Sequence, residues 1–328
     1  MMTPVLILMI VLSVIFDFLN GIHDSSNIVA TMISSRAFSP RVALSVTAVA
    51  EFSGPFIFGV AVAETIGHEV VSAEAITINV LLAALLSAII WNLLTWFLGI
   101  PSSSSHALFG GMIGAVIVGA GVSAIEVHGI KKILTALFLS PIIGLVLGYI
   151  FTKLIFFFAR GATPKINKLF KRSQIVTAIA LALSHGTNDA QKTMGIITLG
   201  LVIGGIIPSF QVPVWVIAIS AGAIALGTSL GGRRLIKTLG SKFYKVRPVH
   251  GFSTQLTSAF VILGASIVGG PVSTTQVVSS AIMGVGSADR VKMVRWGVAK
   301  EIAVAWIVTI PATALVAAGI YWLIEKFF

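Results

Sequence analysis

A polar, glycine-marked motif occurs twice inside otherwise apolar sequence. Residues 21–27 read GIHDSSN and residues 186–192 read GTNDAQK. Each copy places a carboxylate, Asp24 or Asp189, in a long hydrophobic segment. A carboxylate at membrane depth is costly, so the motif indicates a site for an ion or a solute.

Both copies suit a small hard cation such as sodium. Unwound backbone at the glycine would present carbonyl oxygens, and Asp24 with Asn27, like Asn188 with Asp189, adds side-chain oxygens. The carboxylate could instead carry a proton, or simply fix a helix break through hydrogen bonds. Asp17 lies nearby but has no counterpart in the second half, and we assign it no role.

Two hydroxyl-rich stretches indicate an anion site. Residues 101–106 read PSSSSH and residues 271–276 read PVSTTQ, and each opens a small-residue helix ending at Gly114 or Gly284. Proline followed by hydroxyl residues predicts a helix N-terminus, whose free N–H groups can bind an anion. One isolated stretch could merely cap a kinked helix, whereas two facing ends could enclose a tetrahedral oxyanion. The hydroxyl residues assigned to this site are Ser103, Ser104, Ser105, Ser273, Thr274 and Thr275.

Other polar residues admit more than one role. Lys192 could neutralise an anion or pair with Asp189. Glu51, inside the second apolar segment, is a candidate coupling or gating carboxylate. Ser105 and His106 raise the possibility of a serine hydrolase, but helix neighbours point about 100° apart. The second copy also lacks the histidine, so we predict no enzyme.

The composition is that of a membrane protein. The chain has 328 residues, 56% hydrophobic and 10% charged, and its mean hydropathy is +1.03. The net charge of +11 comes from short basic clusters between apolar segments, where the positive-inside rule expects them, so we predict no nucleic-acid partner. The chain contains no cysteine, which excludes disulfides and thiolate metal sites.

Ten apolar segments can be drawn, at residues 4–34, 42–63, 76–100, 104–122, 131–158, 174–206, 212–230, 249–269, 274–287 and 296–324. A straight span needs about 20 residues, so the first and sixth segments are too long. Both contain the aspartate motif, and we predict that both are discontinuous helices.

Charge orients these segments. Residues 36–41 carry two arginines, whereas residues 64–74 carry three glutamates and no lysine or arginine, so the first loop should be cytoplasmic and the second external. The basic clusters in residues 160–172, 233–247 and 290–295 should also be cytoplasmic. Both termini then lie outside, and the halves have opposite orientations, which defines an inverted repeat.

The predicted boundaries follow from this symmetry. The first repeat covers residues 1–159, a basic connection covers 160–173, and the second repeat covers 174–328. Residues 76–122 and 249–287 either cross the membrane fully or form re-entrant hairpins.

Several of these stretches together resemble the PiT family of inorganic phosphate transporters. They are residues 20–27, 90–96 and 101–106 in the first half, and residues 184–195, 251–255 and 271–275 in the second. The resemblance implies symport of phosphate with sodium or protons, in some members as a metal-phosphate complex. It also implies that the hydroxyl tips contact phosphate and that Asp24, Asp189 and Glu51 are functional acids.

The matched motifs add further residues. Gln191 and Lys192 are assigned to the phosphate site, Asn20 to the sodium site, and Gln255 to coupling or gating. The family often has Glu where Gln255 stands and His where Gln276 stands, so the acidic second-half partner of Glu51 is missing. Related permeases carry sulfate.

We therefore predict an all-α polytopic membrane protein with two inverted repeats, broken helices and re-entrant or half helices. It should move phosphate with sodium, or with protons, by alternating access around a midplane site, without an organic cofactor. The alternatives are a permease for sulfate or another oxyanion and a passive anion channel. We expect it in the bilayer of the plasma (cell inner) membrane. The resemblance also implies that the protein self-associates as a homo-oligomer.

Overall fold

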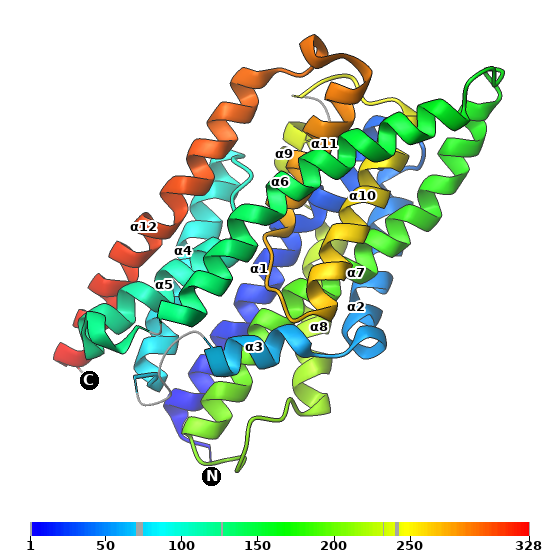
Figure 1. The fold of residues 1–328 in the computed structure, drawn as a ribbon. Coiled ribbons are helices and arrows are strands. Elements are labelled where there is room, and N and C mark those ends of the chain that lie inside the picture. Colours follow the sequence, from blue (N-terminus) through cyan, green and yellow to red (C-terminus); the bar gives the residue numbers. More distant parts are fainter. Residues whose placement is uncertain (1, 70–74, 126, 232, 240–242, 328) are drawn as a thin grey trace.

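The computed structural model describes residues 2–69, 75–125, 127–231, 233–239 and 243–327, which form helices and no strand (Figure 1). The helices are α1 (Pro4–Ser34), α2 (Pro40–Phe58), α3 (Ala61–Glu69), α4 (Ile78–Leu98), α5 (Ser104–Ala120), α6 (Val127–Phe158), α7 (Ile166–Ile203), α8 (Val214–Leu230), α9 (Arg233–Lys237), α10 (Pro248–Ile267), α11 (Thr274–Arg290) and α12 (Trp296–Phe327). Among these residues, α1, α2, α4, α6 and α12 are long and apolar enough to cross a membrane. The prediction of an all-α membrane protein is confirmed.

The aspartate motifs do not interrupt their helices. α1 runs unbroken through Gly21 and α7 through Gly186, so the predicted discontinuity of both helices is wrong. The glycines serve close packing instead. A Cβ on Gly21 would lie 2.1 Å from the carbonyl oxygen of Ile224, and one on Gly186 would lie 2.2 Å from that of Glu51. α7 is longer than the predicted segment 174–206, because it begins at Ile166 and so includes part of the predicted basic connection.

The chain breaks at other glycines. Gly59 has φ 82° between α2 and α3, Gly99 has φ 70° after α4, and Gly269 has φ 71° after α10. Positive φ costs little only for glycine. The last two breaks lead into α5 and α11, half helices of 17 residues each.

Helices of the first half of the chain pack on helices of the second half. α1 packs on α8 and α2 packs on α7. Both crossings are close, because a Cβ on Gly227 would lie 2.0 Å from the carbonyl oxygen of Phe18 and one on Gly54 would lie 2.4 Å from that of Leu183. In both pairs, a helix of the first half therefore packs on a helix of the second.

The half helices are exchanged as well. α5 packs on α12 and α11 packs on α6. A Cβ on Gly114 would lie 2.0 Å from the carbonyl oxygen of Ala314, and one on Gly284 would lie 2.1 Å from that of Leu145. Gly114 and Gly284 are the pair that the sequence repeat brought into correspondence, so the same contact occurs once in each half.

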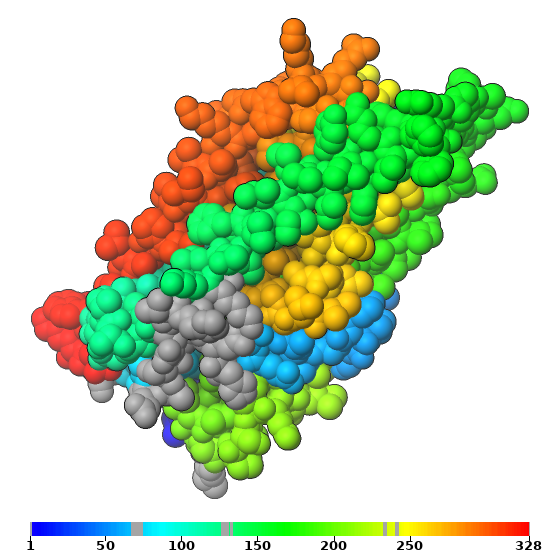
Figure 2. Space-filling view, in the orientation of Figure 1, coloured from blue at the N-terminus to red at the C-terminus, as the bar shows by residue number. Residues whose placement is uncertain are grey.

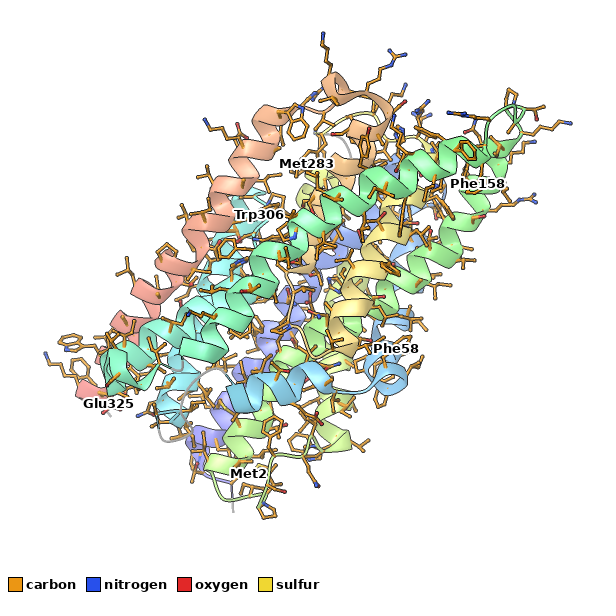
Figure 3. The ribbon with its side chains drawn as sticks, in the orientation of Figure 1. Met2, Phe58, Phe158, Met283, Trp306 and Glu325 are labelled. Atoms are coloured by element: carbon orange, nitrogen blue, oxygen red, sulfur yellow. The ribbon has the colours of Figure 1, made fainter. Side chains whose placement is uncertain are left out.

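The outer surface is apolar, as a lipid-facing surface should be. Figure 2 shows α6 lying diagonally across one face, between α12 and α10. Large hydrophobic residues of α6 such as Phe138 and Ile142 are exposed there. Figure 3 shows Phe158 at one end of the molecule and Glu325 at the other, so α6 and α12 extend between the two ends.

Both chain ends lie at the same end of the molecule, and the turns after α1, α6 and α11 lie at the opposite end (Figure 1). The basic loops therefore share one end, as the charge pattern predicts. Of the charges used for that prediction, Glu74 and Lys242 lie outside the described residues.

Candidate functional site

The polar centre lies between two apolar clusters. One cluster contains the first turns of α1 together with α4 and α5, and the other contains the end of α1 together with α10 and α11. Residues 17–27 of α1 and 184–193 of α7 lie between these clusters and carry the buried polar side chains. A polar layer enclosed in this way excludes lipid and bulk water from the site.

The two hydroxyl stretches are helix N-termini. Ser103 Oγ accepts a hydrogen bond from the His106 N–H (3.1 Å), and Ser273 Oγ accepts one from the Gln276 N–H (3.3 Å). Both serines are thus N-caps, as the sequence predicts. The N–H groups that come before those two donors, on Ser104 and Ser105 and on Thr274 and Thr275, have no acceptor within their own helix and are available to a ligand.

The two N-termini also touch each other. Ser105 Oγ donates to the carbonyl oxygen of Val272 (3.2 Å), and Gln276 Nε2 donates to His106 Nδ1 (3.2 Å). Ser104, Ser105, Thr274 and Thr275 are all at most 3% exposed. Residues from opposite halves of the sequence therefore form one buried junction, which we call the tip junction (residues 102–106 and 272–276).

Both motif aspartates reach the tip junction through α11. Thr275 Oγ1 donates to Asp24 Oδ1 (2.9 Å), and Thr274 Oγ1 donates to Asp189 Oδ2 (2.8 Å). Asn27 Nδ2 donates to Thr275 Oγ1 (3.1 Å). Both carboxylates are fully buried, and both contact the hydroxyls of the α11 tip.

His185 connects three acids, a role that the sequence did not reveal. Its Nε2 lies 3.2 Å from Asp189 Oδ2 and 3.8 Å from Asp24 Oδ2, while its Nδ1 lies 2.9 Å from Glu51 Oε1. The available signal was its position one helical turn before Asp189, since residues four apart share a helix face. Glu51 thus joins the site through histidine.

A cation could be held here. Ligand atoms of Asp24, His185 and Asp189 all lie within 4.8 Å of one another. Asn27 Oδ1 is buried, has no hydrogen-bond partner among the residues that the structure describes, and adds a further oxygen close by. Two carboxylates and an amide oxygen are suitable ligands for a hard cation such as sodium.

The structure shows Lys192 paired with Asp189, which is one of the two roles that the sequence leaves open for this lysine. Its Nζ donates to Asp189 Oδ1 and to the carbonyl oxygen of Val272 (3.1 Å). The lysine therefore compensates a buried carboxylate and holds the α11 tip at the same time. Its charge still lies beside the tip junction.

Two further predicted sodium ligands are buried amides. Asn188 Nδ2 donates to Ser266 Oγ (2.9 Å) and to the carbonyl oxygen of Gly270 (3.2 Å), which holds the link between α10 and α11, while Asn188 Oδ1 is buried and has no hydrogen-bond partner among the described residues. Asn20 is 1% exposed, and neither polar atom of its side chain has a hydrogen-bond partner in the described part of the chain.

Gln191 holds the break between α2 and α3. Its Oε1 accepts from the N–H groups of Val62 (2.7 Å) and Ala63 (3.1 Å), and its Nε2 donates to the carbonyl oxygen of Gly59 (2.6 Å). The contacts of this side chain are with backbone and lie away from the tip junction.

Gln255 is not the repeat partner of Glu51. Glu51 lies on α2, and the exchanged glycine contacts make α2 equivalent to α8, whereas Gln255 lies on α10. Gln255 instead bridges α1 and α7, because its Nε2 donates to Thr31 Oγ1 (3.2 Å) and its Oε1 accepts from Thr177 Oγ1 (2.7 Å). The sequence-based pairing with Glu51 is wrong.

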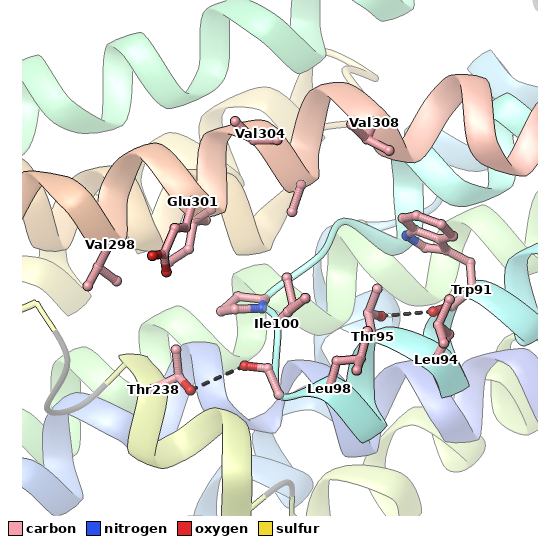
Figure 4. A pocket seen from close by; sticks show the side chains of 14 residues that line it. Trp91, Leu94, Thr95, Leu98, Ile100, Thr238, Val298, Glu301, Val304 and Val308 are labelled. Atoms are coloured by element: carbon pink, nitrogen blue, oxygen red, sulfur yellow. Dashed lines mark hydrogen bonds between the residues drawn. The ribbon is translucent and has the colours of Figure 1, made fainter.

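Each tip lies at the end of an apolar groove. A groove of about 470 Å³ runs between α4 and α12 and reaches Pro101. Figure 4 shows Glu301 on the α12 wall and the hydrogen bond from Thr238 to the Gly99 carbonyl on the other side. A smaller groove of about 320 Å³ between α6 and α10 reaches Val272. Their apolar walls do not suit phosphate.

Known proteins are similar along almost the whole chain. The profile of the family described as "Phosphate transporter family" matches residues 20–317. A Bacillus subtilis protein named "Probable low-affinity inorganic phosphate transporter" is 46% identical over 326 residues, which is 98% of each chain. A Rhizobium meliloti protein with the same name is 44% identical over 97% of this chain and 96% of its own.

A solved structure is similar too. "The sodium-dependent phosphate transporter" superposes with a TM-score of 0.89 and 25% sequence identity, covering 99% of this chain and 100% of that one. The present chain belongs to the phosphate transporter family, and is accordingly a transporter rather than an enzyme.

Proposed function

We propose that this protein is a symporter that moves inorganic phosphate together with sodium across the membrane by alternating access. The observation that carries the proposal is the tip junction, where two helix N-termini meet beside two buried carboxylates. The similar solved structure, which is described as sodium-dependent, supports the choice of ion.

Phosphate would bind at the tip junction. The unpaired N–H groups at the starts of α5 and α11 point toward the space in front of each helix, where the helix dipole favours negative charge. The Ser104 hydroxyl would add a donor, and Lys192 lies beside it. The hydroxyls of Ser105, Thr274 and Thr275 donate to Val272, Asp189 and Asp24 in this structure and would have to leave these acceptors to donate to the anion. A tetrahedral anion can then be held by donors from both halves without an arginine.

Sodium would bind between Asp24 and Asp189, with Asn27 as a further oxygen ligand. Bringing phosphate to a site lined by carboxylates is unfavourable unless a cation offsets the charge, so each ion should strengthen the binding of the other. Thr274 and Thr275 belong to both subsites, since their hydroxyls contact the acids and their backbone opens α11. This sharing is a direct physical route for coupling.

Access to the site would alternate through movement of the α4–α5 and α10–α11 hairpins. Each hairpin carries one tip and is bordered by one apolar groove, and the two grooves are related by the repeat. In the orientation set by the charge pattern, the basic loops face the cytoplasm and both termini face outward, in the plasma (cell inner) membrane.

The test is uptake of labelled phosphate into proteoliposomes under a sodium gradient. Asp24→Asn and Asp189→Asn should each reduce sodium-driven uptake to background, because each removes a charged ligand, while Glu325→Gln at the far end of α12 should leave it unchanged. Excess sulfate in the assay measures selectivity among oxyanions. Unchanged uptake in both aspartate variants would remove the coupling role.

Proton coupling is the second candidate, and the contact between His185 and Glu51 favours it. A buried histidine placed between acids can carry a proton. Uptake driven by an imposed pH gradient in sodium-free buffer would establish this mechanism, and uptake that ignores both gradients would indicate a passive channel.

A further inference from the structure

We propose that the polar cluster formed by Asp17, Asn20, Thr193 and Ser220 is a second sodium site, separate from the one at Asp24 and Asp189. It would take up a cation on the side of the chain termini before the cation reaches the tip junction. The inference rests on the proposed sodium-coupled transport.

Asp17 is a buried acid with too few partners. It is 0% exposed, and its Oδ1 accepts one hydrogen bond, from Thr193 Oγ1 (2.6 Å). Its Oδ2 has no hydrogen-bond partner, and none of the ion pairs found among the described residues includes Asp17. A buried carboxylate without a compensating charge is strongly unfavourable, so this acid either takes up a proton or binds a cation.

Two further polar side chains lie next to this acid. Asn20 stands three residues later on α1, on the same helix face, and both polar atoms of its side chain lack partners in the described part of the chain. Ser220 of α8 is fully buried and lies beside the same carboxyl group, within reach of a hydrogen bond to it. Asp17, Asn20, Thr193 and Ser220 together supply carboxylate, amide and hydroxyl oxygens, which is the ligand chemistry of a small hard cation.

The cluster continues the line of the first site. Asp17, Asn20 and Asp24 follow one another on a single face of α1, and Thr193 follows Asp189 one turn later on α7. Asp17 and Asp24 are seven residues apart, which is about 10 Å along the helix. Because α1 starts at the end of the molecule that holds both termini, the Asp17 cluster is the outer of the two sites in the proposed orientation.

The experiment uses the full-length protein with Asp17→Asn, Asn20→Ala and Thr193→Val. The matched control is Thr198→Val, since Thr198 is equally buried on α7 and its hydroxyl has no hydrogen-bond partner within the described ranges. Two quantities are measured: the sodium concentration that gives half-maximal phosphate uptake, and the rise in melting temperature that sodium chloride produces over choline chloride without phosphate.

We expect the half-maximal sodium concentration to rise about tenfold in Asp17→Asn, with a smaller rise in the other two variants and none in Thr198→Val. The stabilisation by sodium should shrink in the same order. Asn20→Ala and Thr193→Val keep the test valid if Asp17→Asn fails to fold.

If all four variants keep the half-maximal sodium concentration of the wild type, this inference is overturned and the proposed function still stands. Wild-type uptake that ignores sodium would overturn the proposed function, and the stabilisation by sodium then decides the Asp17 site by itself. A response of Asp17→Asn that follows pH and not sodium would make Asp17 a proton carrier and reject the sodium site.

Discussion

Individual glycines set the distance between the central helices. Gly21 and Gly186 each face a backbone carbonyl of a helix from the other half, so even one added methyl group meets atoms that cannot move independently. The sequence alone placed these glycines at the centre of the protein. It could not distinguish glycine that unwinds a helix from glycine that lets two helices touch, because both occur in apolar sequence.

Gly21→Ala should destabilise the protein by about 2 kcal/mol, the usual cost of overpacking a core. Gly222→Ala is the matched control, because a Cβ on Gly222 of α8 meets nothing within 4 Å. Thermal unfolding of the purified protein in detergent measures both. Equal melting temperatures for the two variants would show that the α1–α8 crossing tolerates a side chain.

The structure brings some of the predicted site residues together and leaves others apart. Asp24, Asp189 and the hydroxyl residues were predicted because they repeat, and in the structure the two acids contact the hydroxyls of Thr274 and Thr275. His185 was missed because its importance comes from Glu51, which lies on another helix. Gln191 was assigned to phosphate from its place in a motif, and only three-dimensional contacts reveal its binding to the α2–α3 break.

At the scale of helices, the apolar segments predicted most boundaries within a few residues. α5 and α11 begin directly after the serines that cap them, because a capping hydroxyl followed by apolar residues is a local signal. The split of the second segment at Gly59 was not predicted. It depends on Gln191 and on the neighbouring helices, which no local pattern contains.

The two caps should matter for phosphate affinity. Ser103→Ala or Ser273→Ala removes a hydrogen bond worth about 1 kcal/mol and loosens the N–H groups that face the anion, so the KM for phosphate should rise about fivefold. Thr77→Ala removes an equivalent cap from α4, where Thr77 Oγ1 accepts from the Val80 N–H (3.3 Å), and should leave the KM unchanged. Uptake kinetics at saturating sodium provide the measurement. Equal KM values in all three variants would argue against an anion site at the tips.

At the scale of the whole molecule, each repeat depends on the other. α1 and α2 contact α8 and α7, and the half helices contact α12 and α6, so all four exchanged contacts cross from one half to the other. The charge pattern predicted the opposite orientation of the halves. It could not predict that they interlock, because hydropathy identifies helices but not their neighbours.

Two fragments, residues 1–159 and 160–328, should therefore be unstable when produced alone and should form an active transporter when produced together. Membrane levels of each fragment and phosphate uptake measure this outcome. If the first fragment accumulates alone at the level of the full chain, its helices do not require the glycine contacts with the second half for stability.

Interlocking also constrains how the protein is made. When α1 and α2 have entered the bilayer, α7 and α8, which pack against their glycines, have not yet been synthesised, and α8 ends only at Leu230. The early helices must wait in the bilayer in a provisional arrangement until about two thirds of the polypeptide has been synthesised. During that interval Asp24 lacks the threonine hydroxyls of α11. We therefore expect the chain to be most susceptible to quality-control proteases just after the first repeat has been inserted.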